Sequence, residues 1–364
     1  MKYQIEKHSG ESAYMQLYRQ LRQDIVTGVL PAGSKLPSKR FLATELGLSV
    51  ITVEHAYQLL CDEGCAEARP RSGFYVSFGG RPSPLAAPRR AALADMQAAR
   101  EAAEDFPFSV LARTMRSVLA DYDRRILAES PNEGCVALRQ ALAAWLERSR
   151  GLSVRPEQIL VGSGAEYLYG LVVQLLGRDR VYALEDPSYE KIRRVYEAHG
   201  ARCQLLRMGP DGIESEALRR CEAGVLHVTP FHSYPSGITA SAAKRREYAA
   251  WAESRGAMLV EDDYDSQVAS LSKQAETLFS LAPDRVIYIN TFSKLLAPSM
   301  RTGFMVLPEG LLTAWREKLG FYACTVPVYD QYVLAAFLNE GHLERYVNRR
   351  RRALRQKIKE NTED

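Results

Sequence analysis

The sequence of 364 residues is 46% hydrophobic and 25% charged, with a formal net charge of +4. Such a chain exceeds one typical domain core, and so small a net charge favours no class of partner. Residues 1–7 lack the apolar segment of a secretion signal, and no apolar run reaches membrane-spanning length. Cys61 and Cys65 lack the second pair of ligands that a zinc site needs. We therefore expect a cytoplasmic protein that does not enter a membrane and holds no metal.

The first part of the chain has the pattern of one helix followed by two shorter ones. Apolar residues at helical spacing predict a helix over residues 14–28. Shorter helices are expected over residues 40–46 and 50–63, where Ser38 and Ser49 can cap the first turns. Two short helices joined by a tight glycine turn are typical of the helix-turn-helix motif.

Two short strands are expected directly after these helices. Residues 65–69 and 73–77 flank a turn that contains Pro70 and Gly73. This pattern predicts a hairpin beside the helix-turn-helix. A small helical domain without a nucleic-acid role is the alternative interpretation.

Residues 1–77 resemble the winged helix-turn-helix of GntR-type regulators. The segments LPAGSKLPSKRFLATELGLSVITVEHAYQLLCDEG and ARPRSGFYV carry the resemblance. It implies that the helix from Val50 enters the major groove of DNA, while the hairpin wing and residues 38–40 approach phosphates. Many family members place an arginine where this chain has Val50, so we expect methyl contacts from Val50, or wing contacts, in place of guanine readout. The implied DNA-binding residues are Lys35, Ser38, Lys39, Arg40, Ser49, Val50, Thr52, Arg69, Arg71 and Gly73.

Residues 78–105 are expected to be a linker. Residues 78–84 are rich in glycine and proline, and residues 91–104 have the pattern of a weak helix. A linker of this length can let a small head move relative to a larger body. An arm packed on the body is the other interpretation.

From residue 106 to residue 364 the pattern is α/β. Helical segments such as residues 242–255 separate several short apolar runs. Such alternation implies a mainly parallel sheet covered on both faces. The expected strands are residues 159–161, 181–184, 204–206, 225–228, 258–260, 286–289 and 304–307.

A lysine and an aspartate each follow one of these strands. Lys294 comes shortly after residues 286–289, with hydroxyl residues and Arg301 close to it in sequence. A lysine in such surroundings can form a Schiff base with an aldehyde cofactor while its neighbours hold a phosphate. Asp262 follows residues 257–260, and a carboxylate there can keep a pyridinium nitrogen protonated. The order and spacing of these residues disfavour an ordinary surface lysine.

This second part resembles the fold-type I aminotransferase domain, and the whole chain resembles the MocR subfamily of GntR regulators. The resemblance implies pyridoxal 5'-phosphate as the cofactor. It places Gly164, Ala165, Glu166, Thr291, Ser293 and Arg301 at the phosphate, Tyr189 against the ring, Asp262 at the ring nitrogen, Tyr264 at the phenolic oxygen, and Lys294 as the catalytic Schiff-base lysine.

Three further positions either depart from the family pattern or have no cofactor-binding role in it. Aminotransferases have an asparagine where this chain has Tyr234, so its role passes to Tyr234, to His232 or to no residue. Asp263 and Asp265 are expected to be turn and capping residues.

Relatives of this kind continue into a small C-terminal domain whose arginine binds the substrate carboxylate. No residue of this chain is assigned that role, so we expect a C-terminally truncated body with at most a partial transamination reaction. The basic run of residues 349–352 is expected to be a solvated helix face.

Three functions are compatible with these patterns. The favoured one is a DNA-binding transcriptional regulator whose pyridoxal phosphate senses a small amine or amino acid. An aminotransferase with an appended DNA-binding head, and a DNA-binding module with an inert or dimerising body, are the alternatives. The expected partners are a double-stranded DNA operator, the effector and a second copy of the chain.

Overall fold

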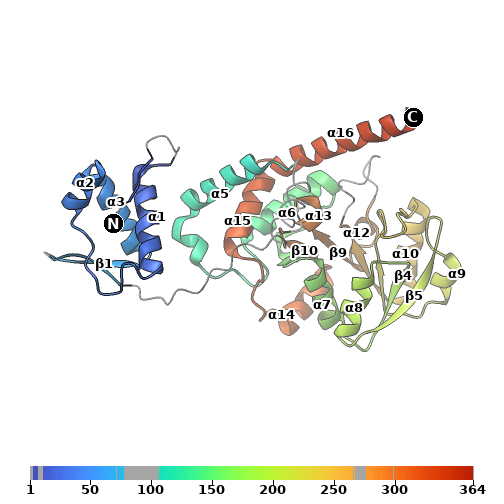
Figure 1. Ribbon diagram of the computed structural model, residues 1–364. Helices are drawn as coiled ribbons and strands as arrows, with labels where there is room; N and C mark the ends of the chain where they lie inside the picture. The colour runs from blue at the N-terminus through green and yellow to red at the C-terminus, as the bar shows by residue number, and fades with distance from the viewer. Residues whose placement is uncertain are drawn as a thin grey trace. The chain divides into compact units, whose positions relative to one another are not determined.

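The computed structural model describes residues 3–6, 11–70, 72–77, 106–264, 266, 276–297 and 299–363. The chain divides into two compact units, Met1–Gln97 and Ala98–Asp364, which we call the head and the body (Figure 1). The expected linker of residues 78–105, together with Arg71 and Asp265, lies outside the described residues.

Within its described residues, the head consists of three helices and a two-stranded hairpin, as the sequence predicts. Ser38 and Ser49 accept hydrogen bonds from the backbone amides of Phe41 (3.1 Å) and Thr52 (3.0 Å), which fixes where the two shorter helices begin. Gly47 ends the first of these in the left-handed conformation (φ 63°), which glycine adopts readily. The elements are α1 (Ala13–Val26), α2 (Lys39–Leu46), α3 (Val50–Asp62), β1 (Ala66–Arg69) and β2 (Gly73–Val76).

The loop before α2 is tied to the wing. The Leu36 amide donates to the Phe74 carbonyl (2.8 Å), and the Val76 amide donates to the Ser34 carbonyl (2.9 Å). Gly73 has φ +117°, and a Cβ there would lie 3.2 Å from Cε of Lys35. A glycine at this position therefore lets Lys35 lie against the wing.

The body is built on an eight-stranded sheet of order β3-β10-β9-β8-β7-β4-β5-β6. Strand β10 runs antiparallel to both of its neighbours, β6 runs antiparallel to β5, and the remaining pairs are parallel. This confirms the mainly parallel sheet, and every predicted strand is present. The strands are β3 (Ile159–Gly162), β4 (Val181–Asp186), β5 (Arg202–Gly209), β6 (Gly212–Ile213), β7 (Val225–Val228), β8 (Met258–Asp262), β9 (Val286–Thr291) and β10 (Gly303–Val306).

Helices cover both faces of the sheet. One face packs against α7 (Ala165–Leu176), α8 (Glu190–Ala198) and α14 (Leu312–Lys318), and the other packs against α6 (Val136–Arg150), α10 (Ala242–Arg255) and α15 (Val328–Asn339) (Figure 1). Because both faces of the sheet are covered, β7 and β9 are buried along their whole length and do not alternate between buried and exposed residues. The cofactor residues predicted from sequence come from the ends of these strands.

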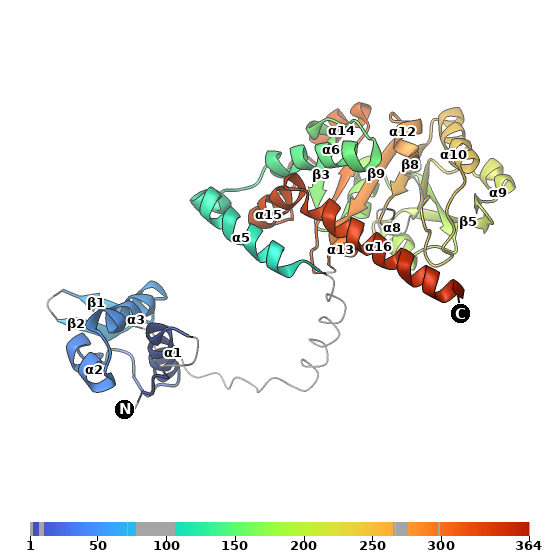
Figure 2. The ribbon, with the colours of Figure 1, turned by 90° about the horizontal axis from the view of Figure 1, so that it is seen from above.

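Most of the remaining helices are short connecting segments of the body. Figure 2 shows α5, α15 and α16 next to one another, in agreement with their contacts. Within the described residues, no helix combines the length and apolar character that a bilayer crossing requires. These elements are α5 (Phe108–Tyr122), η1 (Asp123–Leu127), η2 (Pro156–Gln158), α9 (Ser215–Arg220), α12 (Leu278–Leu281), α13 (Phe292–Leu295), η3 (Glu309–Leu311) and α16 (His342–Glu363).

Candidate functional sites

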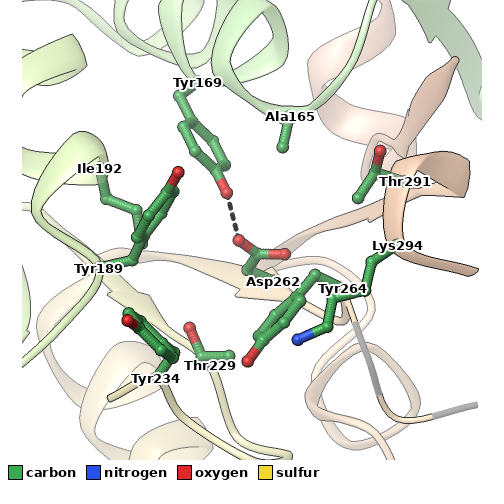
Figure 3. Close-up of a pocket in the computed structure, with 10 residues that line it drawn as sticks. All are labelled: Ala165, Tyr169, Tyr189, Ile192, Thr229, Tyr234, Asp262, Tyr264, Thr291 and Lys294. Atoms are coloured by element: carbon green, nitrogen blue, oxygen red, sulfur yellow. Dashed lines mark hydrogen bonds between the residues drawn. The ribbon is translucent and has the colours of Figure 1, made fainter. Parts of the chain in front are cut away.

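A pocket of about 320 Å³ opens where the parallel strands end. Figure 3 shows that Ala165 and Thr291 lie on one side of it, and that Tyr189 and Tyr234 lie on the opposite side. The pocket brings together residues from five separate segments of the body. Its lining consists of Ala165, Tyr169, Tyr189, Ile192, Thr229, Tyr234, Asp262, Tyr264, Thr291 and Lys294.

Lys294 reaches this pocket from α13, which begins directly after β9. Thr291 accepts a hydrogen bond from the Ser293 amide (3.3 Å) and so caps the short helix. The ammonium nitrogen of Lys294 lies 4.8 Å from the centre of the Tyr264 ring (Figure 3). The strand end and the cap therefore place this amine inside the cavity.

Asp262 forms part of the pocket wall and is 3% exposed. The Tyr169 hydroxyl donates to its Oδ2 atom (Figure 3), and His227 Nε2 lies 3.8 Å from the same oxygen. Its Oδ1 atom is buried and has no hydrogen-bond partner among the described residues. A buried carboxylate oxygen of this kind calls for a donor, preferably a charged one. A protonated pyridine nitrogen has that chemistry, so this residue fits the expected cofactor.

Three tyrosines form the other walls of the pocket. Tyr189 lies at the start of α8, and its ring meets that of Tyr234 edge-on with centroids 6.1 Å apart. The Tyr264 hydroxyl donates to the His232 carbonyl (2.9 Å). Of the two residues weighed for the missing asparagine's role, Tyr234 lines the pocket, whereas His232 supplies a backbone contact to Tyr264.

The predicted phosphate residues gather at the beginning of α7. Gly164 has φ +94°, and a Cβ there would lie 3.2 Å from a guanidinium nitrogen of Arg301. Glycine is therefore needed both for the backbone conformation and for the close approach of Arg301. The first amides of α7 and the guanidinium are suited to bind an anion.

Glu166 and Ser293 have side-chain partners of their own near this cradle. The Glu166 carboxylate pairs with Lys191 (2.9 Å) and lies 3.8 Å from Arg301, so the phosphate role that remains for Glu166 is its backbone amide. The Ser293 hydroxyl donates to the Met300 carbonyl (3.1 Å). Ala165 and Thr291 line the pocket itself.

Asp263 is not the turn or capping residue that the sequence suggests. Its carboxylate is buried, lies 3.0 Å from Nε of Arg150 and accepts a hydrogen bond from the Tyr288 hydroxyl (2.6 Å). Neighbouring residues of a strand point to opposite faces, so Asp262 and Asp263 cannot both reach the pocket. No local pattern pointed to Arg150, because it ends a helix far away in the chain.

Sequence analysis also missed the polar groups behind the pocket. Glu185 in β4 is buried and accepts hydrogen bonds from the Ser233 hydroxyl (2.7 Å) and from the backbone of Thr229. Burial raises the pKa of the Glu185 carboxyl to about 8. In β7, His227 Nδ1 lies 2.6 Å from the Tyr196 hydroxyl. An ionisable residue inside an otherwise apolar strand is the signal that could have revealed both Glu185 and His227.

Several predicted DNA-binding residues of the head are exposed at its surface. Lys35, Arg40 and Arg69 are cations with solvent-accessible side chains, and the Arg69 guanidinium lies 4.3 Å from the centre of the Tyr75 ring. Lys39 forms an ion pair with Glu54 of α3. Its charge is therefore shared with a carboxylate on the predicted recognition helix.

The first turn of α3 exposes apolar side chains. Val50 is 40% exposed and Ile51, which the sequence analysis did not single out, is 64% exposed. The hydroxyls of Ser49 and Thr52 lie 2.8 Å apart, and Ser49 also caps the helix. The structure thus places Val50 and Ile51 outward on a helix that starts at a defined residue.

Comparison with known proteins agrees with the two-unit architecture. Residues 13–76 match the family model of bacterial regulatory proteins of the gntR family, and residues 72–363 match that of aminotransferase class I and II. The regulator YdeL of Bacillus subtilis is 31% identical over 94% of this chain and 77% of its own. The pyridoxine biosynthesis regulator PdxR of Corynebacterium glutamicum is 30% identical over 96% of this chain and 78% of its own.

A solved aminotransferase shares the fold of the body. The α-aminoadipate aminotransferase LysN of Thermus thermophilus, complexed with N-(5'-phosphopyridoxyl)-L-leucine, is 29% identical with a TM-score of 0.62. The match covers 70% of this chain and 66% of LysN, which is less than two thirds of that enzyme.

These findings define a class of protein: the chain belongs to the family of bacterial regulators that join a gntR-type helix-turn-helix to an aminotransferase class I and II domain. Within that family it is a transcriptional regulator of the MocR and PdxR type, and regulators with this helix-turn-helix bind DNA. The fold of its body is that of pyridoxal phosphate-dependent enzymes.

Proposed function

We propose that this regulator binds pyridoxal 5'-phosphate in the body pocket and changes its DNA binding when a small amine or amino acid enters that pocket. The proposal rests on two groups that line one cavity: the Lys294 amine, and the Asp262 Oδ1 atom, which has no hydrogen-bond partner among the described residues. When bound, the cofactor supplies an aldehyde to which amines add reversibly.

The residues around the pocket have separate tasks in this proposal. Asp262 accepts a hydrogen bond from the ring nitrogen and keeps its proton in place, and Tyr169 holds that carboxylate in position. Lys294 supplies the amine that competes with the effector for the aldehyde. The start of α7, Thr291 and Arg301 bind the phosphate.

Residues 1–77 are the proposed DNA-binding domain, residues 78–105 the linker and residues 106–364 the cofactor-binding domain. Because its partner is DNA, we also propose that the protein is cytoplasmic. A regulator of this design also needs an effector that binds two states of the protein with different affinities, because only differential binding shifts an equilibrium.

The Lys294 assignment is tested by reducing the full-length protein with borohydride after incubation with pyridoxal phosphate. Mass spectrometry should find the pyridoxyl adduct on Lys294, and Lys294→Ala should remove it. Lys191→Ala is the matched control, because Lys191 lies beside the pocket residue Tyr189, 5.8 Å from its ring centre. An adduct on another lysine, or none at saturating cofactor, would contradict the assignment.

The sensing step is tested separately by titrating the cofactor-loaded protein with amines and amino acids. At least one of them should shift the absorbance spectrum and change the affinity for a DNA duplex enriched by the protein from a random library. Steady transamination that proceeds while DNA affinity stays constant with every amine would favour the aminotransferase alternative.

A further inference from the structure

We infer that Val50 and Ile51 select operator sequence by packing against the 5-methyl groups of thymines in the major groove. This inference rests on the proposed DNA-binding function and adds which feature of the DNA is read. It concerns specificity alone, since affinity for phosphates comes from other residues.

Helix α3 has one side buried in the core of the head and one side exposed to solvent. Val53, Ala56 and Tyr57 are fully buried in the core of the head, whereas Val50 and Ile51 are exposed. Two β-branched apolar side chains at the start of a helix are therefore left in contact with water. The Ser49 cap fixes the backbone of this turn, so both side chains are held at defined places.

Two polar side chains on the outer side of α3 have polar partners within the head, and a third packs against an aromatic ring. Glu54 pairs with Lys39, and the amide of Gln58 donates to Asp62 (3.0 Å). The His55 ring packs edge-on against Tyr14 with centroids 5.8 Å apart. The first turn therefore presents methyl groups, where a guanine-reading helix would present an arginine.

The surrounding charge agrees with a DNA duplex as the occupant of this surface. Lys35, Arg40 and Arg69 are solvent-accessible cations of the head, and Arg69 shares its charge with Glu67 of the same strand (2.7 Å). Cations of this kind bind phosphates and set the register of the helix in the groove. The apolar feature that the major groove offers is the thymine methyl group, and each one buried is expected to change affinity about fourfold.

The test begins with the full-length protein and a random duplex library, from which the enriched duplex becomes the probe. Each thymine of that duplex is then replaced by deoxyuridine, which lacks only the methyl group. We expect at least one replacement to weaken binding about fourfold. Ile51→Ala or Val50→Ala should remove that penalty, so that the thymine and deoxyuridine duplexes bind equally well.

The matched control is Val29→Ala, because Val29 is an exposed apolar residue of the head (57%) outside α3. This variant should keep the deoxyuridine penalty. Unchanged binding at every deoxyuridine position, or a penalty that persists in both α3 variants, would overturn the inference while leaving DNA binding intact. Failure to enrich any sequence would overturn the DNA-binding proposal itself.

Discussion

Asp262 and Asp263 are adjacent in sequence, but their side chains have different surroundings and different roles. Asp262 faces the pocket and has one oxygen without a hydrogen-bond partner in the described part of the chain, whereas Asp263 lies against Arg150 on the opposite side of the sheet. Burial raises the pKa of the Asp263 carboxyl, and the Arg150 guanidinium acts in the opposite direction. One carboxylate is thus available to a ligand, and its neighbour belongs to the core.

Substitutions at these two positions should therefore have different effects. Asp262→Asn should weaken pyridoxal phosphate binding about ten- to hundredfold, since a charged hydrogen bond is lost. Asp263→Asn should instead lower the free energy of unfolding by about 3 kcal/mol, because it leaves Arg150 without its anionic partner. Cofactor titration and urea unfolding measure the two effects. A larger loss of cofactor affinity in folded Asp263→Asn than in Asp262→Asn would contradict this register.

Glu185 should make the stability of the body depend on pH. Its folded-state pKa of about 8 lies above the ordinary value of 4.5. The folded state therefore keeps a proton that the unfolded chain releases, so stability falls as the pH rises from about 4.5 to about 8. The Glu185→Gln variant has no titrating carboxyl at this position, but its amide oxygen can still accept the hydrogen bond from Ser233. The melting temperature of the variant minus that of the wild type should therefore increase as the pH rises from about 5 to about 8. A constant difference would show that the carboxyl titrates normally.

At the scale of elements, the ion pair between Lys39 and Glu54 links α2 to α3 of the head. The lysine attracts DNA phosphates and the glutamate repels them. Lys39 and Glu54 each retain solvent exposure, so the pair itself contributes little to stability. The ion pair affects DNA binding instead, because Glu54 neutralises Lys39, a cation that the family resemblance places at a DNA phosphate.

The salt dependence of DNA binding should reveal this competition. Arg40→Ala should reduce the slope of log K against log salt concentration by about one unit, as one phosphate contact is lost. Glu54→Gln should release Lys39 and increase the slope by up to about one unit. A slope unchanged in Glu54→Gln would show that Lys39 does not reach a phosphate.

At the scale of the whole molecule, the body carries large apolar side chains on its surface. Phe108, Leu127 and Phe321 are 72%, 82% and 72% exposed, and Phe321 stacks on Tyr322 with ring centroids 4.5 Å apart. We take these side chains as candidates for a contact surface between copies of the chain. We propose that two copies of the chain associate through the body, so that two heads bind one operator with added affinity.

Sedimentation velocity of the full-length protein should detect a dimer at micromolar concentration. Leu127→Glu and Phe321→Glu should shift it towards the monomer, because each places a charge in an apolar contact. Val29→Glu, a similar change on the head, should leave the dimer intact. A monomeric wild-type protein at this concentration would contradict the proposal.

Much of the architecture could be predicted from sequence because it depends on local interactions. Caps such as Ser49 bond to amides three residues away, and the apolar runs of the parallel strands are recognisable without their neighbours. The wing, the α/β alternation and the position of Lys294 after β9 followed from such patterns. The two-residue strand β6 was missed because it is too short to have a period.

The partners of the ionisable groups were decided by the tertiary structure alone. Tyr169 meets Asp262 across 93 residues of sequence, and Glu185 meets Ser233 across 48. Arg150 and Lys39 likewise have their carboxylates on other elements of the fold. The sequence determines which chemical group each side chain carries. Whether that group is protonated, and whether it is accessible to a ligand, depends on its burial and on which distant groups pack against it.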